Sequence, residues 1–313
     1  MITTIENDVW RAEIDSLGAQ LKSLCHKGLC REYLWQGCAE IWSGTCPVLF
    51  PITGGLWNKQ LRWQGREYTL PRHGFAKNLE WTPLPQAEAD RAVFRIQPGE
   101  DYPVTAFPFP LALELTFCLQ PDGLAVYYRV WSTQPDREGY YQIGGHPAFM
   151  LSGRAADVPA VTDEREGYLR LLDKQGQPCR RVELRIAGEQ GCLEERTPVL
   201  TLGDEGLLAV TPAAFADDTI IVAGRQVGRV ELLDNNCRRV LTVESPAPAW
   251  LFWRAAAGRS PFVCIEPWWG LPDTQHFCGE FSEKYYVQHL LPGGVDSGLL
   301  WQVHFPADKQ TQR

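Results

Sequence analysis

The chain has 313 residues, of which 44% are hydrophobic and 22% are charged, and its net charge is −8. This composition is ordinary for a globular protein, and the lack of a long basic run argues against a surface for nucleic acid or anionic membranes. We find no apolar run long enough to span a membrane and no secretory signal at the start, so we expect a cytoplasmic protein. The ten cysteines contain no C-x-x-C pair, which favours reduced, packed thiols over a zinc site.

Short segments of alternating apolar and polar residues recur along the chain, separated by 28 glycines and 23 prolines. Long segments with the 3.6-residue periodicity of a helix are not evident. This pattern predicts an all-β protein. Outside the central hairpin, the predicted strands in chain order are 9–14, 18–24, 32–35, the proline-bounded run 47–52, a hairpin over 62–68 that turns at Gln64-Gly65, 142–146, 207–210, 219–222, 229–233, 239–243, 249–253 and 262–265.

The strongest single signal is a hairpin in the middle of the chain. Over residues 111–120, leucine or phenylalanine alternates with smaller or polar residues, and the same alternation returns over residues 124–130. Pro121-Asp122-Gly123 lies between the two runs and supplies turn residues. A period of two sustained over this length predicts a sheet with one buried face.

The segment 152–196 is more charged and less regular than its neighbours. We interpret it as a set of excursions from the sheet. No internal repeat, low-complexity tract or shift in composition marks a linker, so the sequence predicts a single domain over residues 1–313.

Three titratable residues lie beside glycine or proline and close to aromatic residues, namely His73, His146 and Glu266. His146 follows Gly144-Gly145 and precedes a proline, so we expect it to be held rigidly at a strand end with open space beside it. Glu266 follows an apolar strand and precedes Pro267-Trp268-Trp269. Burial there would raise its pKa and let it act as a base near neutrality. Tryptophans beside polar groups are also typical of a sugar-binding surface.

Each of these residues also has a purely structural interpretation. His146 could be a satisfied histidine at a strand end, His73 a turn-capping residue and Glu266 the partner of a buried arginine. Sequence spacing alone does not decide whether the three converge. The remaining histidines lack such contexts, which predicts surface or packing roles for positions 26, 276, 289 and 304.

Six motifs occur in the order seen in one enzyme family. They are Gly18-Ala19-Gln20-Leu21-Lys22-Ser23-Leu24, Glu32-Tyr33-Leu34-Trp35, Pro47-Val48-Leu49-Phe50-Pro51, His73-Gly74-Phe75-Ala76, Gly145-His146-Pro147-Ala148-Phe149 and Glu266-Pro267-Trp268. On these residues the chain resembles the aldose 1-epimerase (galactose mutarotase-like) family, in its bacterial branch with an H-G-F-A motif. The resemblance implies a large, twisted antiparallel β-sandwich, the galactose mutarotase-like supersandwich, with an open sugar-binding cleft.

The resemblance also implies roles for individual residues. His146 would be the general acid, Glu266 the general base, and His73 a second histidine near the sugar ring oxygen. Asp218 matches the aspartate that binds sugar hydroxyls in this family, although the adjacent Asp217 could take that place. Ring opening and closure by one acid and one base needs no metal and no cofactor.

The chain departs from the family at two basic positions. Many relatives carry an arginine after the glycine of the early P-I-x-G segment, and this chain has none there. Lys59, Arg62 or Arg72 could replace it. Lys77 stands where an arginine usually follows H-G-F-A, which keeps the charge and loses the bidentate fork. We expect Arg72 and Trp268 to contact the substrate.

Three functions remain open at this point. The first is a mutarotase that interconverts the α- and β-anomers of a hexose. The second is a hexose-phosphate 1-epimerase, which would need basic residues at the cleft rim. The third is a non-catalytic carbohydrate-binding or sensing protein of the same fold. In each case we expect a small-molecule sugar as the partner, no nucleic acid or membrane, and a monomer or homodimer.

Overall fold

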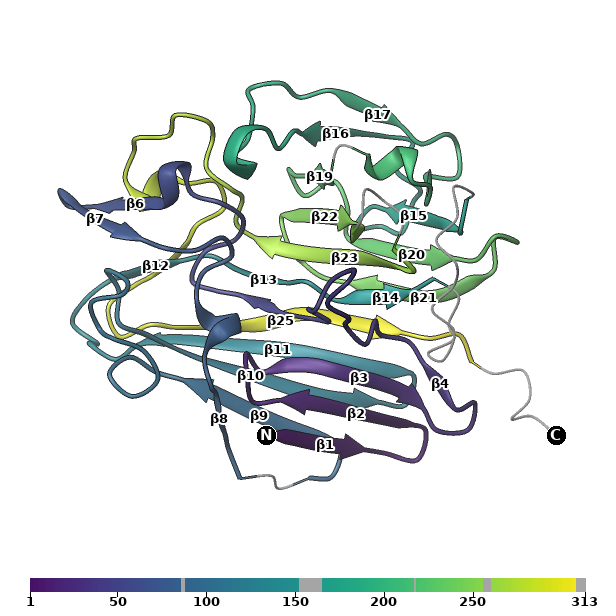
Figure 1. Ribbon diagram of the computed structural model, residues 1–313, viewed down its shortest axis with the longest axis horizontal. Coiled ribbons are helices and arrows are strands. Elements are labelled where there is room, and N and C mark those ends of the chain that lie inside the picture. The colour runs from purple at the N-terminus through teal and green to yellow at the C-terminus, as the bar shows by residue number, and fades with distance from the viewer. Residues whose placement is uncertain (86–87, 152–164, 217, 256–259, 308–313) are drawn as a thin grey trace.

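The computed structural model describes residues 1–85, 88–151, 165–216, 218–255 and 260–307, and its regular structure is almost entirely β, as predicted (Figure 1). Its strands are β1 Ile2–Glu6, β2 Trp10–Asp15, β3 Gln20–His26, β4 Arg31–Glu32, β5 Val48–Leu49, β6 Gln60–Trp63, β7 Arg66–Thr69, β8 Thr82–Pro83, β9 Arg91–Ile96, β10 Leu111–Gln120, β11 Gly123–Ser132, β12 Gly139–Tyr141, β13 Ile143–Gly145, β14 Ala148–Met150, β15 Tyr168–Leu172, β16 Arg181–Arg185, β17 Val199–Thr201, β18 Leu207–Ala209, β19 Thr219–Val222, β20 Arg229–Leu233, β21 Arg239–Glu244, β22 Ala249–Trp253, β23 Phe262–Trp269, β24 Gln288–Leu290 and β25 Val295–His304. The short 3-10 helices are η1 Trp57–Lys59, η2 Ala76–Asn78, η3 Glu189–Gly191, η4 Ala213–Phe215 and η5 Phe281–Glu283. None of the helices in the described part of the chain has the length and apolar character needed to cross a membrane.

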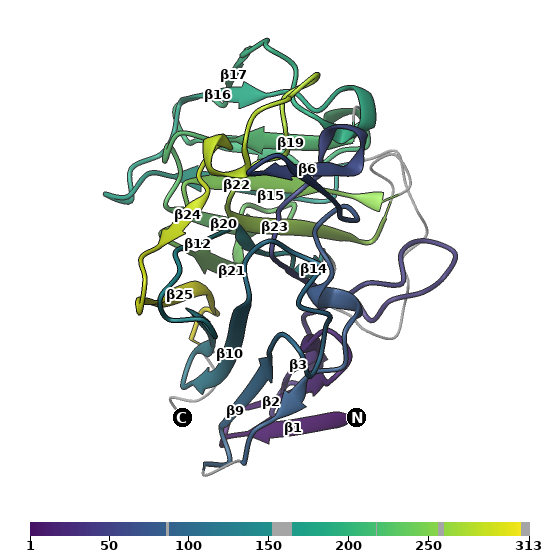
Figure 2. The same ribbon diagram turned by 90° about the vertical axis from the view of Figure 1, so that its left-hand side faces the viewer.

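Two large antiparallel sheets form the body of the molecule (Figures 1 and 2). The first, here called the broad sheet, has nine strands in the order β18-β15-β20-β21-β25-β11-β10-β9-β8. The second, here called the site sheet, runs β17-β16-β19-β22-β23-β13-β5, and β14 pairs with β23 beside β13. A four-stranded N-terminal sheet, β1 to β4, lies beside the broad sheet. The predicted antiparallel β-sandwich is therefore confirmed.

The predicted hairpins are confirmed in detail. Strands β10 and β11 pair in one unbroken register from Leu111 opposite Ser132 to Gln120 opposite Gly123. Strands β6 and β7 pair around Gln64 and Gly65, and both of these residues have positive φ. Positive φ at both central residues matches the twist of a two-residue hairpin turn, and glycine takes that conformation without strain.

The interpretation of residues 152–196 as excursions from the sheets is wrong for two stretches, 168–172 and 181–185. Strand β15 lies inside the broad sheet between β18 and β20, and strand β16 belongs to the site sheet beside β19. Residues 152–164 lie outside the described part of the chain. The charged residues hid these strands because their outward faces are polar: Arg170 on β15 forms an ion pair with Glu231 on the neighbouring strand β20.

Strand β23 is longer than the sequence predicts, because it continues through Glu266 and Pro267 to Trp269. On one side β22 pairs along it, with Leu251 opposite Glu266. On the other side its partner is interrupted: β13 ends at Gly145 and β14 begins at Ala148. Pro267 has no backbone N–H to donate, so a proline is tolerated opposite such a break.

Side chains, and not open space, lie next to the two glycines that precede His146. A Cβ on Gly144 would lie 2.8 Å from the ring of Trp268, and a Cβ on Gly145 would lie 2.6 Å from the ring of Trp301 on β25. Strand β13 therefore packs closely on the core between the two sheets. This packing is a physical reason to expect His146 to be held rigidly. The open space expected beside His146 is the cavity that its side chain lines.

Candidate active site

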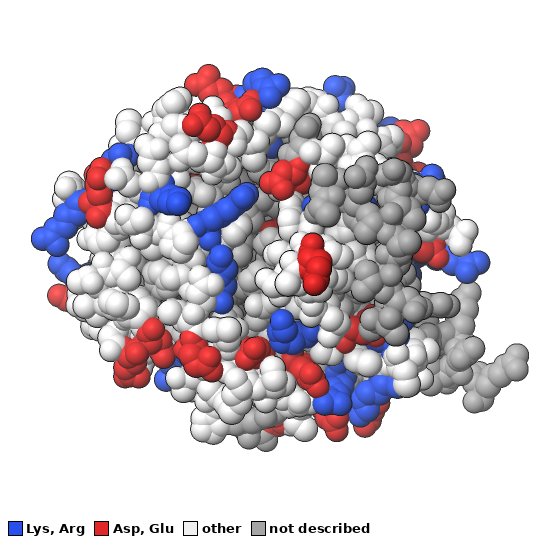
Figure 3. Space-filling model, viewed as in Figure 1, with Lys and Arg blue, Asp and Glu red and all other residues white. Residues whose placement is uncertain are grey.

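One face of the molecule is hollowed near its centre, and Lys and Arg side chains lie along the hollow (Figure 3). The cavity has a volume of about 450 Å³. All six predicted site residues line it: Arg72, His73, His146, Asp218, Glu266 and Trp268. The remaining lining residues are Leu17, Gln20, Trp42, Ser43, Gly44, Pro47, Lys77, Asn78, Ala187, Gly191, Thr219, Ile221, Leu251, Trp253 and Pro272.

The floor of the cavity is one face of the site sheet. Strands β19, β22 and β23 each contribute two residues spaced by two, because alternate residues of a strand point to the same face. These pairs are Thr219 and Ile221, Leu251 and Trp253, and Glu266 and Trp268. The register places Leu251 opposite both Ile221 and Glu266, so the three pairs lie side by side. The sequence motif around Glu266 is thus one part of a continuous surface.

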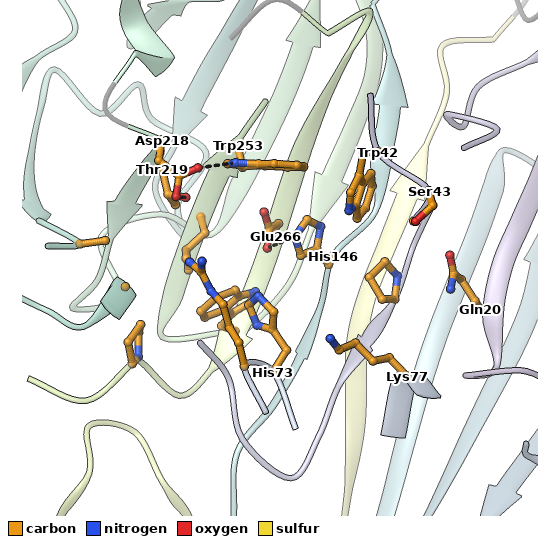
Figure 4. Close-up of a pocket in the computed structure, with 18 of the residues that line it drawn as sticks. Gln20, Trp42, Ser43, His73, Lys77, His146, Asp218, Thr219, Trp253 and Glu266 are labelled. Carbon is orange, nitrogen blue, oxygen red and sulfur yellow. Dashed lines mark hydrogen bonds and ion pairs between the residues drawn. The ribbon is translucent and has the colours of Figure 1, made fainter. Parts of the chain in front are cut away.

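His146 and Glu266 form the closest pair of titratable groups in the cavity (Figure 4). Nε2 of His146 lies 3.3 Å from Oε2 of Glu266, and both side chains are almost fully buried. The break between β13 and β14 sets this geometry, since it turns His146 away from the ladder opposite Glu266. The ionisable side chain in contact with Glu266 is a histidine, and Glu266 forms no ion pair with an arginine among the described residues.

Burial dominates the electrostatics of this pair. It raises the pKa of the Glu266 carboxyl well above its ordinary value, and the charge of Arg72 opposes that shift. It lowers the pKa of His146 to about 3, while the imidazole's own backbone carbonyl acts in the opposite direction. Both shifts favour the uncharged forms. In this uncharged form a protonated carboxyl lies beside a neutral imidazole, and the pair carries one transferable proton.

His73 approaches the same pair from a strained loop. Its φ is +68°, and its Nδ1 accepts a hydrogen bond from the backbone N–H of Gly54 at 3.1 Å. Burial lowers its pKa well below the ordinary value, and the neighbouring His146 adds to the shift. A neutral ring whose Nδ1 accepts must carry its proton on Nε2. His73 thus fixes its loop, as the structural interpretation supposed, and also presents a fixed N–H donor to the cavity.

Asp218 lies at the opposite side of the cavity from Lys77 (Figure 4). Its Oδ1 accepts a hydrogen bond from Nε1 of Trp253 at 2.7 Å. Its Oδ2 accepts a long hydrogen bond from Oγ1 of Thr219 at 3.4 Å, and because the side chain is exposed this oxygen can also accept from a ligand hydroxyl. Asp217, the alternative to Asp218, lies outside the described residues.

Of the four basic residues considered from the sequence, two reach the cavity. Arg72 and Lys77 line it, and neither forms an ion pair with any residue that the structure describes. The guanidinium of Arg72 lies against Gly191, where a Cβ would be 3.3 Å from its Cζ. Arg62 is held elsewhere, by Glu67 and the carbonyl of Phe277, and Lys59 is exposed outside the cavity.

Comparison with known proteins agrees with this fold. Residues 1–291 match the sequence profile of the family described as aldose 1-epimerase. The chain belongs to the aldose 1-epimerase family. It is 27% identical to the plasmid-encoded LacX protein of Lactococcus lactis subsp. lactis over 301 residues, which cover 93% of this chain and 95% of LacX.

Two solved structures show the same architecture. A galactose mutarotase related enzyme from Lactobacillus acidophilus superimposes with a TM-score of 0.84 at 26% identity, covering 99% of each chain. A galactose mutarotase-like protein from Lactobacillus casei superimposes with a TM-score of 0.81 at 24% identity, covering 98% of this chain and 100% of that one. Both likenesses extend over the whole sandwich, so the family fold is shown from end to end.

Two aromatic residues that line the cavity of this aldose 1-epimerase family member were not predicted from the sequence. Trp42 stacks on the ring of His146, with centroids 5.1 Å apart and an interplanar angle of 28°. Trp253 meets the same imidazole edge-on, with centroids 5.8 Å apart. The alternation of β22 offered a signal for Trp253, because it shares a face with Leu251. No local pattern distinguished Trp42, which lies in the loop between β4 and β5.

The same region offers one group of potential metal ligands among the described residues. Ligand atoms of His146, Cys264 and Glu266 all lie within 4.8 Å of one another. A metal would need the Cys264 thiolate, because the thiolate and not the thiol is the ligand. Burial raises the pKa of that thiol well above its ordinary value. The donor set therefore fits poorly with a metal.

Proposed function

We propose that this protein is an aldose 1-epimerase that interconverts the α- and β-anomers of a hexose, with Glu266 as general base and His146 as general acid. The observation that carries the proposal is the buried His146–Glu266 pair, 3.3 Å apart in a cavity wide enough for a sugar. Membership of the aldose 1-epimerase family supports it.

The reaction requires two proton transfers at neighbouring oxygens. Ring opening removes the proton from the C1 hydroxyl and adds a proton to the ring oxygen, and both oxygens are bonded to C1. Two proton-transfer groups must therefore lie side by side, as Glu266 and His146 do. The open aldehyde turns about the C1–C2 bond, and closure on the other face gives the second anomer.

The pair carries one proton throughout this cycle. Before opening, Glu266 is a carboxylate and His146 an imidazolium. After opening, Glu266 is protonated and His146 is neutral. The two states hold the same number of protons, so the reaction needs none from solvent. Burial favours the uncharged state of the pair. The bound sugar must supply the opposite bias. The charge of Arg72 favours the Glu266 carboxylate but disfavours the His146 imidazolium, so it helps only one half of the charged pair.

The other lining residues have roles consistent with this scheme. The Nε2–H of His73 is a fixed donor beside His146, suited to a hydrogen bond with the ring oxygen or an adjacent hydroxyl. The exposed carboxylate of Asp218 and the guanidinium of Arg72 can hold hydroxyls farther from C1. The ring of Trp253 offers an apolar face to the C–H side of the sugar.

The test is anomer exchange catalysed by a Glu266→Gln variant. Polarimetry and exchange NMR on glucose and galactose would compare it with the wild type and with Glu114→Gln. Glu114 is a matched control, because it is a buried glutamate on β10 that pairs with Arg95 outside the cavity. We expect Glu266→Gln to lower kcat about 10²–10⁴-fold with the fold intact, and Glu114→Gln to keep its activity.

Two outcomes would contradict this proposal. Full activity in Glu266→Gln would remove Glu266 from the mechanism. Tight sugar binding by the wild type with anomer exchange at the background rate, over a broad set of aldoses, would instead favour the non-catalytic carbohydrate-binding protein.

A second candidate, a hexose-phosphate 1-epimerase, is favoured by the basic side of the cavity. Arg72 and Lys77 line it without ion-pair partners among the described residues. Burial lowers the pKa of the Lys77 ammonium, so its charge is partly desolvated and would gain from an anionic partner. Gln20 lies at the same end and uses its oxygen to accept from Thr45, which leaves its amide N–H groups free to donate.

Rates on free and phosphorylated hexoses would separate the two candidates. If a phosphate binds beside Lys77, Lys77→Met should raise KM for the phosphorylated sugar about tenfold or more, and much less for the free sugar. Lys59→Met, outside the cavity, is the matched control. An equal effect of Lys77→Met on both substrates would rule out a phosphate subsite there.

A further inference from the structure

Trp42 is fixed above the cavity by its own loop. Its backbone carbonyl accepts hydrogen bonds from the N–H of Cys38 at 3.0 Å and from Nε1 of Trp35 at 2.8 Å. Its indole lies over Gly44, where any Cβ would collide with the ring. The edge of Trp253 and the ring of Phe262 pack against it, with centroids 5.4 Å and 5.6 Å away. The indole plane therefore has little freedom to turn.

The imidazole of His146 lacks the restraint that usually orients a catalytic histidine. In such residues the second ring nitrogen commonly donates to a carboxylate or a carbonyl. Nδ1 of His146 is buried and makes no hydrogen bond with any other described residue; only the backbone carbonyl of His146 itself acts on the ring. Ring contacts surround it instead: Trp42 stacks on one face, and the rings of Trp253 and His73 approach at 77° and 88°. Figure 4 shows His146 between Trp42 and Glu266.

We propose that Trp42 is a positioning residue that takes the place of this missing hydrogen bond. Its indole face holds the imidazole of His146 in the plane that points Nε2 at Glu266. The same face stabilises the imidazolium that must form before a proton is given to the sugar ring oxygen. Trp42 acts through His146, and the inference rests on the proposed function only in taking His146 as the acid.

The electrostatic part of the argument follows from the neighbours of His146. A cation over the face of a tryptophan is attracted by the ring quadrupole, most strongly where water is excluded. Burial alone would keep the imidazole neutral. The polar or charged groups nearest to it are divided. The backbone carbonyl of His146 itself, and Glu266 when it is a carboxylate, favour the imidazolium, whereas the positive charges of Arg72 and Lys77 disfavour it. The Cys264 thiol and the His73 ring are neutral. Trp42 thus adds to the small set of groups that favour the imidazolium form of His146.

The experiment compares Trp42→Leu and Trp42→Phe with the wild type and with Trp57→Leu. Trp57 is a matched control, because its indole also meets a histidine, His276, edge-on at 4.5 Å and outside the cavity. Ring-nitrogen NMR of labelled histidine would report the imidazolium fraction of His146 against pH, a reading that needs no turnover. Anomer exchange would be measured over the same pH range.

We expect Trp42→Leu to lower the pKa of His146 by about one unit and to lower kcat at pH 7 about tenfold, with KM within about twofold of wild type. Trp42→Phe keeps an aromatic face, so it should retain most of the wild-type pKa of His146 and most of the wild-type kcat. It also keeps the test decisive should Trp42→Leu fold poorly. Trp57→Leu should leave the His146 titration and kcat unchanged.

Two results would overturn the proposal. An unchanged His146 titration in both Trp42 variants would show that the indole does not act on the imidazole. A rise in KM with kcat unchanged would make Trp42 a surface for the sugar instead. If His146 titrates as expected but the wild type shows no anomer exchange, the proposed function fails while the role of Trp42 on His146 stands.

Discussion

Replacing Gly145 with alanine tests whether packing beneath β13 holds His146 in place. A Cβ at Gly145 would lie 2.6 Å from Cδ1 and 2.7 Å from Nε1 of Trp301, against the roughly 3.5–4.0 Å of an ordinary contact. Either the ring or the strand must therefore move by about 1 Å. Trp301 is 1% exposed and packed between the sheets, so it cannot turn into solvent.

The size of the effect follows from two opposing terms. Overpacking a well-packed core costs about 1–3 kcal/mol. Alanine in place of glycine restores about 0.4–1 kcal/mol by restricting the unfolded chain, because the φ of Gly145 is one that alanine can adopt. We expect the free energy of unfolding to fall by about 1–2 kcal/mol. A shift of His146 by a fraction of this movement should also lower kcat markedly, since misplacement by about 1 Å can cost 10²-fold.

Urea unfolding and anomer exchange would measure the two effects. Gly298→Ala is the matched control: Gly298 lies on a strand, and a Cβ there would meet Tyr128 at an ordinary 3.6 Å. The double variant Gly145→Ala/Trp301→Leu should lose less stability than the sum of the two single variants, because the clash is then gone. A Gly145→Ala protein that unfolds at the same urea concentration as Gly298→Ala would refute the reasoning.

Two further predictions concern buried charges. Burial raises the pKa of Glu266 in the folded state. Its contribution to the free energy of unfolding is therefore fully present below the unfolded-state pKa of about 4.3 and is lost as the pH rises. Glu266→Gln should therefore gain stability relative to wild type between pH 5 and pH 8 in urea unfolding, and a pH-independent difference would contradict this. Lys284 and Asp273 form a buried ion pair beside the cavity. Lys284→Met would leave the Asp273 charge buried without this partner, so it should lower the free energy of unfolding by about 3–5 kcal/mol. Adding Asp273→Asn should reduce the loss, and a single variant as stable as wild type would argue against the pair.

Most of the predicted strands have one apolar and one polar face, although β9, which has the same alternation, was not predicted. The β10–β11 and β6–β7 hairpins are examples, because their register depends on alternation and on local turn residues. Strand β15 was missed because an ion pair across the sheet, Arg170 with Glu231, gave it a charged outer face. Strand β23 was cut short because a proline inside a strand is tolerated only opposite a break that the sequence does not reveal.

The sequence by itself determined the class of fold, the family resemblance and the residue types that could exchange protons. Glycine, proline and aromatic neighbours marked His73, His146 and Glu266 as unusual, since those effects act over a few residues. Tertiary structure alone decided that these residues meet, through the break between β13 and β14. It alone set the 3.3 Å separation and the burial that shifts both pKa values, and it brought Trp42 onto the imidazole. Burial and register depend on strands distant in the chain, and no local pattern carries that information.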